Sequence, residues 1–313
     1  MSSAFDDVLT SSETTEEEQA QIQEDITDGF DTGSSSRGKL IPFSYLGGKY
    51  KHLNWLLPLL PHNKSYVEPY GGSGVVLLNR EQSDVETFND KYSEITNFFR
   101  VLREKPTELM QKISLTPYSE EEFELAQKRA DDISNVEQAR RFFVLVNMSY
   151  DKNINTPNWS YSVNYSSRGV SKKISSYQAK LKRIKPMAER LSEVQICNKD
   201  ALDVIDRFDS DTATMYCDPP YPSSERVFDD VYGVEMDNDD QKEMLQKLQK
   251  CDADIAVSSY ENMLYDNVLL EDGWEKVFAE EKKLSASAVN STSRTEVLYV
   301  NYEVTDEMME EAY

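Results

Sequence analysis

The chain has 313 residues, of which 39% are hydrophobic and 11% aromatic, and its formal net charge is −23. A chain of this length can bury a large core, and we expect one large domain with a smaller inserted or second one. The acidic balance argues against a nucleic-acid-binding protein that is basic throughout. The longest apolar runs, at residues 75–78 and 142–146, are far too short to span a bilayer, and the N-terminus lacks a signal-peptide pattern.

Cysteine and histidine are scarce. The three cysteines are widely spaced, and the only histidines are His52 and His62. This argues against a structural zinc site and favours a reducing cytoplasm, so we expect no metal and no membrane contact.

Residues 1–38 hold ten acidic side chains and one Arg37, with almost no large apolar residue. Such a segment cannot bury a core, and we predict a disordered acidic tail. The ordered part should begin near Lys39.

Two glycine-containing turns follow. The apolar residues 40–46 are followed by a turn at Gly47 and Gly48 and then by Lys49. Two glycines allow the backbone to approach a ligand closely, but they equally fit an ordinary turn before a helix at 52–60. Residues 65–79 predict a buried strand, a glycine-rich turn and a helix, which together present backbone N–H groups to a ligand at the carboxyl end of the strand. The turn is neither GxGxxG nor a phosphate loop.

A second strand, residues 85–90, ends in Asp90. In doubly wound folds an acid at this place commonly binds ribose hydroxyls. Asp90 or Ser93 could also cap a helix at 94–103, and the two interpretations are compatible.

Residues 104–185 differ in character. A capping box at 119–122 and an amphipathic pattern at 137–147 predict helices, with Phe142, Phe143 and Val146 facing inward. A polar, aromatic loop at 149–170 leads into a stretch with eight cations against Glu189: Arg168, Lys172, Lys173, Lys180, Lys182, Arg183, Lys185 and Arg190. This local reversal of charge is typical of contact with a phosphate backbone, and the neighbouring Asn and aromatic residues suit base readout or stacking. Alternatively, residues 180–190 form the solvated face of a helix that packs through Leu181, Ile184 and Leu191.

The later half alternates predicted strands (195–200, 214–217, 254–258, 294–301), the first of which ends in the acid Asp200, with predicted helices (201–208, 238–249, 262–271). This is the pattern of a mainly parallel α/β sheet. Within it, Asp218-Pro219-Pro220-Tyr221 ends a strand rigidly, because neither proline offers an N–H and both fix φ. The simpler interpretation is an Asp-Pro turn with a buried tyrosine, but the four residues together favour a site.

The order of these motifs resembles the Dam-like DNA adenine N6-methyltransferases. Tyr66-Val67-Glu68-Pro69-Tyr70-Gly71-Gly72-Ser73-Gly74 is similar to the cofactor motif of that family and residues 218–221 to its catalytic motif, with a target-recognition region between them. The resemblance extends over residues 40–301. It implies an α/β fold, a Rossmann-like S-adenosylmethionine-dependent methyltransferase sheet with a mostly helical inserted target-recognition domain. The implied domains are a catalytic domain at 39–103 and 191–313 and a DNA-binding insert at 104–190.

The resemblance also implies S-adenosylmethionine as cofactor and double-stranded DNA as partner, with a cognate restriction endonuclease as a further candidate partner. The implied catalytic residues are Asp218, Pro219, Pro220 and Tyr221. The implied cofactor-binding residues are Tyr45, Lys49, Glu68, Tyr70, Gly71, Gly72, Gly74, Asp90 and Asp200. The implied DNA-binding residues are Asn153, Asn158, Trp159, Tyr161, Arg168, Lys172 and Lys173.

In this hypothesis the Asp218 carboxylate and the Pro219 carbonyl accept the two hydrogens of a flipped adenine amine, and Tyr221 stacks on the base. Three alternatives stay open: methylation of cytosine N4, methylation of an RNA amine, and a non-catalytic DNA-binding relative. The basic, Asn-rich insert argues against a small-molecule methyltransferase.

Overall fold

A computed structural model describes residues 39–43, 48–128, 130, 132–150, 157–166, 169–221, 236–279 and 295–313. Residues 39–313 form one compact unit. The predicted acidic tail at 1–38 lies outside the described residues, as do Tyr45, Asn153 and Arg168. The three cysteines are all described and are free thiols.

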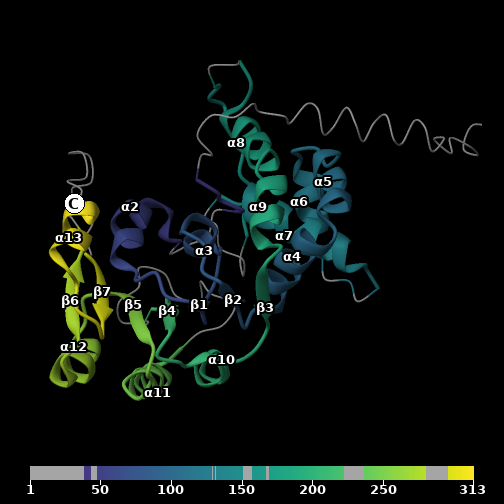
Figure 1. Ribbon diagram of the computed structural model, residues 1–313. Coiled ribbons are helices and arrows are strands. Elements are labelled where there is room, and N and C mark those ends of the chain that lie inside the picture. Colours follow the sequence, from purple (N-terminus) through teal and green to yellow (C-terminus); the bar gives the residue numbers. More distant parts are fainter. Residues whose placement is uncertain are drawn as a thin grey trace, which may run out of the picture. The chain divides into compact units, whose positions relative to one another are not determined.

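One sheet organises the described part of the chain, with the strand order β3-β2-β1-β4-β5-β7-β6 (Figure 1). All neighbours pair in parallel except β7, which is antiparallel to both β5 and β6. The expected mainly parallel α/β sheet is therefore confirmed. The strands are β1 (Ser65–Glu68), β2 (Val85–Asn89), β3 (Val194–Cys197), β4 (Ala213–Cys217), β5 (Asp254–Tyr260), β6 (Glu275–Phe278) and β7 (Glu296–Val300).

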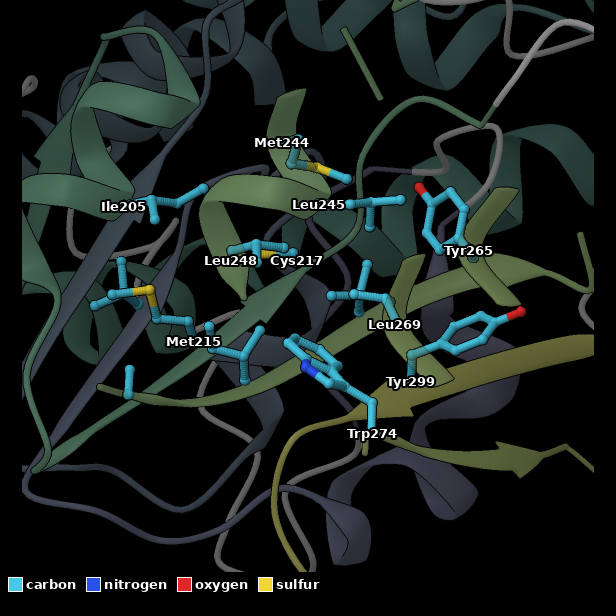
Figure 2. Close-up of a cluster of buried hydrophobic side chains, with 14 of the residues drawn as sticks. Ile205, Met215, Cys217, Met244, Leu245, Leu248, Tyr265, Leu269, Trp274 and Tyr299 are labelled. Carbon is cyan, nitrogen blue, oxygen red and sulfur yellow. The ribbon is translucent and has the colours of Figure 1, made fainter. Parts of the chain in front are cut away.

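One hydrophobic core lies between one face of this sheet and three helices, α10 (Ala201–Phe208), α11 (Asn238–Leu248) and α12 (Met263–Leu269). Because side chains alternate along a strand, Met215 and Cys217 of β4 point into this core while Tyr216 points to the other face. Figure 2 shows Met215 and Cys217 among Ile205, Met244, Leu245, Leu248, Tyr265, Leu269, Trp274 and Tyr299.

The opposite face carries the N-terminal elements. A short helix α2 (Leu53–Leu56) lies between the 3-10 turns η1 (Lys49–His52) and η2 (Leu57–Leu59), where residues 52–60 predicted one helix. Pro58 lies in η2, and its missing N–H does not suit a longer α-helix. Helix α3 (Val75–Asn79) follows the glycine-rich turn, and α13 (Asp306–Ala312) contacts α2 and η2.

Between β2 and β3, the described residues form six helices. They are α4 (Ser93–Glu104), α5 (Pro106–Ser114), α6 (Glu120–Gln127), α7 (Asn135–Met148), α8 (Lys172–Leu181) and α9 (Ile184–Leu191). Ser119 caps α6 through the amide of Glu122, and Phe142, Phe143 and Val146 are buried, as predicted.

The single helix expected over 180–190 is wrong, because the chain breaks between α8 and α9. In a continuous helix Pro186 would clash with the carbonyl of Lys182, four residues earlier. Leu181, Ile184 and Leu191 are nevertheless buried, as that interpretation expected. Among the described helices, none is long and apolar enough to cross a membrane.

Candidate active site

The strand order changes direction at β1 and β4. Successive strands run from β1 to β2 and β3 on one side, and from β4 to β5 on the other. Loops that leave two such neighbours diverge, and the crevice between them is the usual ligand site of open α/β sheets. A pocket lies at this place. It is lined from the first half by Gly48, Lys49, Glu68, Pro69, Tyr70, Gly71, Gly72, Ser73, Asp90, Lys91 and Tyr92, and from the second by Asp200, Ala201, Leu202, Tyr216, Asp218, Pro219, Pro220, Met236, Asp240 and Glu243.

The glycine-rich turn is packed tightly against β2. A Cβ atom at Gly71 would lie 2.1 Å from Cε2 of Phe88, so no larger residue fits without displacing that ring. The Gly71 amide donates to the Asn89 carbonyl at 2.7 Å, and the Gly74 amide donates back to the Gly71 carbonyl at 2.8 Å. Gly74 adopts a φ of 62°, which favours glycine. The turn therefore brings bare backbone to the pocket.

Asp90 holds this turn. One carboxylate oxygen accepts the Gly72 amide and the other the Tyr92 amide, each at 2.8 Å. Burial raises the pKa of Asp90 to about 6, and these two hydrogen bonds oppose the rise. The helix-cap interpretation of Asp90 and Ser93 is wrong, since α4 begins after Tyr92 with no side-chain cap. Asp90 does line the pocket, so binding of a ribose stays a prediction.

Asn89 ties three strand ends together and was not predicted. Its side-chain nitrogen donates to the carbonyls of Pro69, at 2.8 Å, and Lys199, at 3.2 Å, and its oxygen accepts the Lys199 amide at 2.9 Å. It is fully buried. The strand reads Val-Glu-Thr-Phe-Asn, so its polar residues give no distinct sequence signal for this role of Asn89.

Two further acids line the pocket and differ in their protonation states. Glu68 is buried and accepts the Tyr66 hydroxyl at 2.8 Å, and burial raises the pKa of Glu68 to about 8. Asp200 caps α10 through the Leu202 amide at 3.0 Å and pairs with Lys91 at 2.8 Å. The hydrogen bond from Lys91 lowers the pKa of Asp200. At neutral pH, Asp200 is therefore charged while Glu68 is largely protonated.

Asp218 follows β4 and lines the same pocket, with 21% of its side chain exposed. Lys49 Nζ lies 2.6 Å from Asp218 Oδ1 and 3.3 Å from Glu296 Oε1. Burial raises the pKa of Asp218 to about 6, with Lys49 opposing that rise and Glu296 adding to it. The carboxylate is thus mostly ionised at neutral pH and can accept hydrogen bonds.

Lys49 and Tyr221 are held by Glu296. The Tyr221 hydroxyl donates to Glu296, and the Tyr221 ring meets Tyr260 edge-on with centroids 4.8 Å apart. Tyr221 is 5% exposed, as the buried-tyrosine interpretation of the turn expects. Lys49, predicted to bind the cofactor, borders the pocket but pairs with the Asp218 carboxylate. Glu296 was missed, although a charged residue at the start of an apolar strand is a visible signal.

The two prolines are held from α11. Gln241 Nε2 donates to the Pro220 carbonyl at 2.6 Å, while Gln241 Oε1 accepts the Tyr265 hydroxyl at 2.6 Å. Gln241 was also missed. It stands three, four and seven residues before Met244, Leu245 and Leu248, so it occupies an apolar stripe as a polar residue.

The DNA-binding residues that the structure describes lie between α7 and α8 and on α8. Trp159 is half-buried and pairs with Ser149 in a short bridge, while Asn158 and Tyr161 are exposed. Lys172 is exposed at the start of α8, and Lys173 Nζ lies 5.7 Å from the centre of the Tyr150 ring. Large apolar side chains are also exposed here, namely Tyr150, Tyr161, Val163, Tyr165 and Val170. These predicted contacts therefore gather in one stretch of chain, away from the residues that line the pocket.

Two of the eight cations counted in the basic stretch do not fit a phosphate contact. Arg190 pairs with Glu86 of β2 and donates to the Leu77 carbonyl at 2.8 Å, and Lys180 donates to Asn147. Glu86 is 1% exposed, and Arg190 is a counterion of this buried acid together with Arg80, which lies 3.3 Å from it. Sequence alone does not reveal this pairing, because 104 residues separate the partners.

Comparisons of sequence and structure identify known proteins that are similar to this chain. The chain is 38% identical to the modification methylase StsI of Streptococcus sanguinis over 74 residues, which is 23% of this chain but 11% of that protein's length. Two solved structures of the rRNA methyltransferase aviRa from Streptomyces viridochromogenes align with 91% of this chain and 95% and 94% of theirs. Their identities are 14% and 13% and their TM-scores 0.36 and 0.33, too low to bear on fold or substrate.

The sequence model described as D12 class N6 adenine-specific DNA methyltransferase matches residues 45–302. That range contains the glycine-rich turn, the helices after β2 and the Asp218–Tyr221 motif, in the order that the resemblance required. The chain belongs to the D12 class N6 adenine-specific DNA methyltransferase family.

Proposed function

We propose that this protein transfers a methyl group from S-adenosylmethionine to the N6 amine of a flipped adenine in double-stranded DNA. The observation that carries the proposal is the meeting of two motifs in one pocket. The glycine-rich turn after β1 and Asp218-Pro219-Pro220 after β4 border the same crevice, although about 150 residues separate them in sequence. Family membership supports the adenine amine as the target.

The pocket residues fit the proposed cofactor. Tyr70, Tyr92 and Leu202 offer apolar walls, and the bare backbone at Gly71 and Gly72 allows close approach. Asp90 and Asp200 supply carboxylate oxygens, which suit hydroxyl groups and a positively charged ligand. When bound, S-adenosylmethionine supplies an electrophilic methyl group.

Asp218 and Pro219 act on the adenine amine. The lone pair of that nitrogen is delocalised into the ring, so the amine is a poor nucleophile. The Asp218 carboxylate accepts one N–H and the Pro219 carbonyl the other, which directs the lone pair toward the methyl donor. Acceptors held by two prolines do not reorganise during the reaction, and holding the reactants together lowers the entropic barrier.

The base must leave the duplex to reach this pocket. Tyr221 is the stacking partner in this proposal, and its ring has to become accessible as the base enters, because it is 5% exposed in the structure. Tyr161 and Trp159, with Asn153, Asn158, Arg168, Lys172 and Lys173, contact the DNA. Tyr161 and Lys172 are exposed, which suits this role. The further proposed partner is a cognate restriction endonuclease. The proposed location is the cytoplasm, where the DNA lies.

The test is transfer of labelled methyl groups by the full chain to double-stranded DNA, followed by digestion and identification of the modified nucleoside. We expect N6-methyladenine, and its loss in Asp218→Ala. Asp272→Ala, an exposed aspartate outside the pocket, is the matched control. N4-methylcytosine, modification of RNA alone, or DNA binding without transfer would each replace the proposal by one of the three alternatives.

A further inference from the structure

Glu296 lies behind the catalytic motif. It is the first residue of β7, is 7% exposed and pairs with Tyr260 across the sheet. Its carboxylate accepts the Tyr221 hydroxyl and lies 3.3 Å from Lys49 Nζ. It is absent from the pocket lining and contacts the site through these two neighbours, while its charge also raises the pKa of Asp218.

Lys49 is the link between Glu296 and Asp218. Its side chain is 3% exposed, and its ammonium lies 2.6 Å from Asp218 and 4.9 Å from the centre of the Tyr221 ring. A buried ammonium is costly unless it is paired on several sides. Two carboxylates and an aromatic face supply that pairing, and glutamine in place of Glu296 would keep an acceptor oxygen for Lys49 while removing one of the two negative charges.

We propose that Glu296 is a positioning residue of the methyl-transfer site, which fixes Lys49 against Asp218 and fixes the ring of Tyr221. This inference rests on the proposed function. Through Lys49, Glu296 sets the orientation of the Asp218 carboxylate. Through the Tyr221 hydroxyl, it sets the plane of the ring that stacks on the base.

The charges around Asp218 give this arrangement a measurable signature. The groups that face it are Lys49 from η1, Glu296 from β7, Tyr221 beyond β4, Tyr216 and Cys217 within β4, and Tyr265 from α12. Lys49 lowers the pKa of Asp218 and Glu296 raises it. Neutralising Lys49 should therefore raise that pKa, and neutralising Glu296 should lower it. A role in folding alone would not produce shifts of opposite sign.

The experiment compares Lys49→Met, Glu296→Gln and the double variant with the wild-type full chain. Single-turnover methyl transfer is measured over a pH series from acid to mildly alkaline conditions with saturating DNA and S-adenosylmethionine. We expect the acid limb, near pH 6 in the wild type, to move up by at least about 1 unit in Lys49→Met and down in Glu296→Gln, with the double variant in between. On the alkaline plateau we expect Glu296→Gln to be about 10-fold slower, because a neutral amide holds the Lys49 ammonium and the Tyr221 hydroxyl less firmly than a carboxylate does.

Lys276→Met is the matched control. Lys276 also bridges two acids, Glu261 at 3.0 Å and Asp266 at 2.8 Å, but outside the pocket. The Lys276→Met variant should leave the pH of the acid limb unchanged. Shifts of equal sign in Lys49→Met and Glu296→Gln, or a uniform loss of rate without a shift, would overturn the inference.

A second readout does not depend on activity. The carboxyl carbon of Asp218, assigned with Asp218→Asn and followed by carbon-13 NMR, should titrate with the same opposite shifts in the two variants. If the wild type transfers no methyl group but these shifts appear, the proposed function fails while the electrostatic arrangement holds. If transfer occurs and both variants titrate like the wild type, the inference fails.

Discussion

Gln241 of α11 holds the backbone of Pro220 through a 2.6 Å hydrogen bond from its side-chain nitrogen to the Pro220 carbonyl. The other end of the same amide accepts the Tyr265 hydroxyl. The Asp218–Tyr221 segment is therefore fixed both by its own prolines and by a helix that packs one face against the sheet.

Gln241→Leu should slow methyl transfer by about 10-fold or more without changing the Michaelis constant for the cofactor. The change leaves the Pro220 carbonyl and the Tyr265 hydroxyl without their partner, at a cost of about 1–3 kcal/mol for each buried group. Methyl-transfer kinetics and urea unfolding measure the two effects. Gln249→Leu, which removes the 2.8 Å bond to the Val268 carbonyl at the end of the same helix, is the control. An equal loss of rate in both variants would show that the Pro220 contact has no special role.

Gly71→Ala should destabilise the protein by about 1–3 kcal/mol and weaken cofactor binding, because its Cβ would overlap the Phe88 ring. Calorimetric titration with S-adenosylmethionine and denaturant unfolding measure these effects. Phe88→Leu in the same chain removes the overlapping ring atoms and should restore part of the cofactor affinity.

Gly273→Ala is the control for this prediction. Gly273 has a φ of 86°, and a Cβ atom added there would have no other atom within 4 Å, so alanine costs roughly 1–2 kcal/mol of backbone strain without a clash. Cofactor affinity should stay unchanged. Weakened binding in Gly273→Ala would mean that stability, not the glycine-rich turn, governs affinity.

Glu68→Gln should stabilise the protein at pH 8 relative to the wild type and leave stability similar near pH 4. Since burial raises the pKa of Glu68 from 4.5 to about 8, the folded state holds a proton that the unfolded state has lost between these values. The stability contributed by this group is therefore present below pH 4.5 and is lost as the pH rises toward 8, by up to about 1.4 kcal/mol per unit. Glutamine keeps an acceptor for the Tyr66 hydroxyl. Urea unfolding of both proteins from about pH 4 to pH 8 measures the difference, which a flat profile would contradict.

Lys172→Ala should weaken DNA binding about equally for all sequences and reduce the slope of log affinity against log salt by about 0.9, the value for one phosphate contact. Lys172 is exposed at the start of α8. Fluorescence anisotropy with a labelled duplex at several salt concentrations measures the slope. Lys250→Ala, an exposed lysine after α11, should leave it unchanged. An unchanged slope in Lys172→Ala would remove Lys172 from the DNA interface.

The parts of the fold that the sequence predicted are those with strong local signals. The strand, turn and helix around Gly71–Gly74 and the rigid end of β4 depend on residues that are adjacent in the chain. Strand β6 was not predicted, because only one of its four residues is buried. Helix α13 was not predicted, because none of its residues is buried. Neither element has the regular spacing of apolar residues from which helices and strands are predicted.

The contacts that support the site could not be predicted, for a different reason. Lys49, Asp218 and Glu296 come from three distant segments, and their pairing follows from the strand order, which places β7 beside β5. Gln241 and Asn89 look like ordinary polar residues until the carbonyls that they hold are known. Motifs identify the groups that react, whereas the groups that hold them depend on tertiary structure.

The ion pair between Arg190 and Glu86 limits how this protein can be recombined with its relatives. It joins α9, the last helix before β3, to a buried acid of β2, so the segment proposed to recognise DNA and the sheet share an interface at that end. A chimera that takes residues 135–181 from a relative leaves both partners in place, whereas one that exchanges residues through 190 can remove Arg190 and leave Arg80 as the remaining cation beside the buried Glu86. Exchange of sequence specificity by segment swapping should therefore use the break between α8 and α9 as its downstream joint.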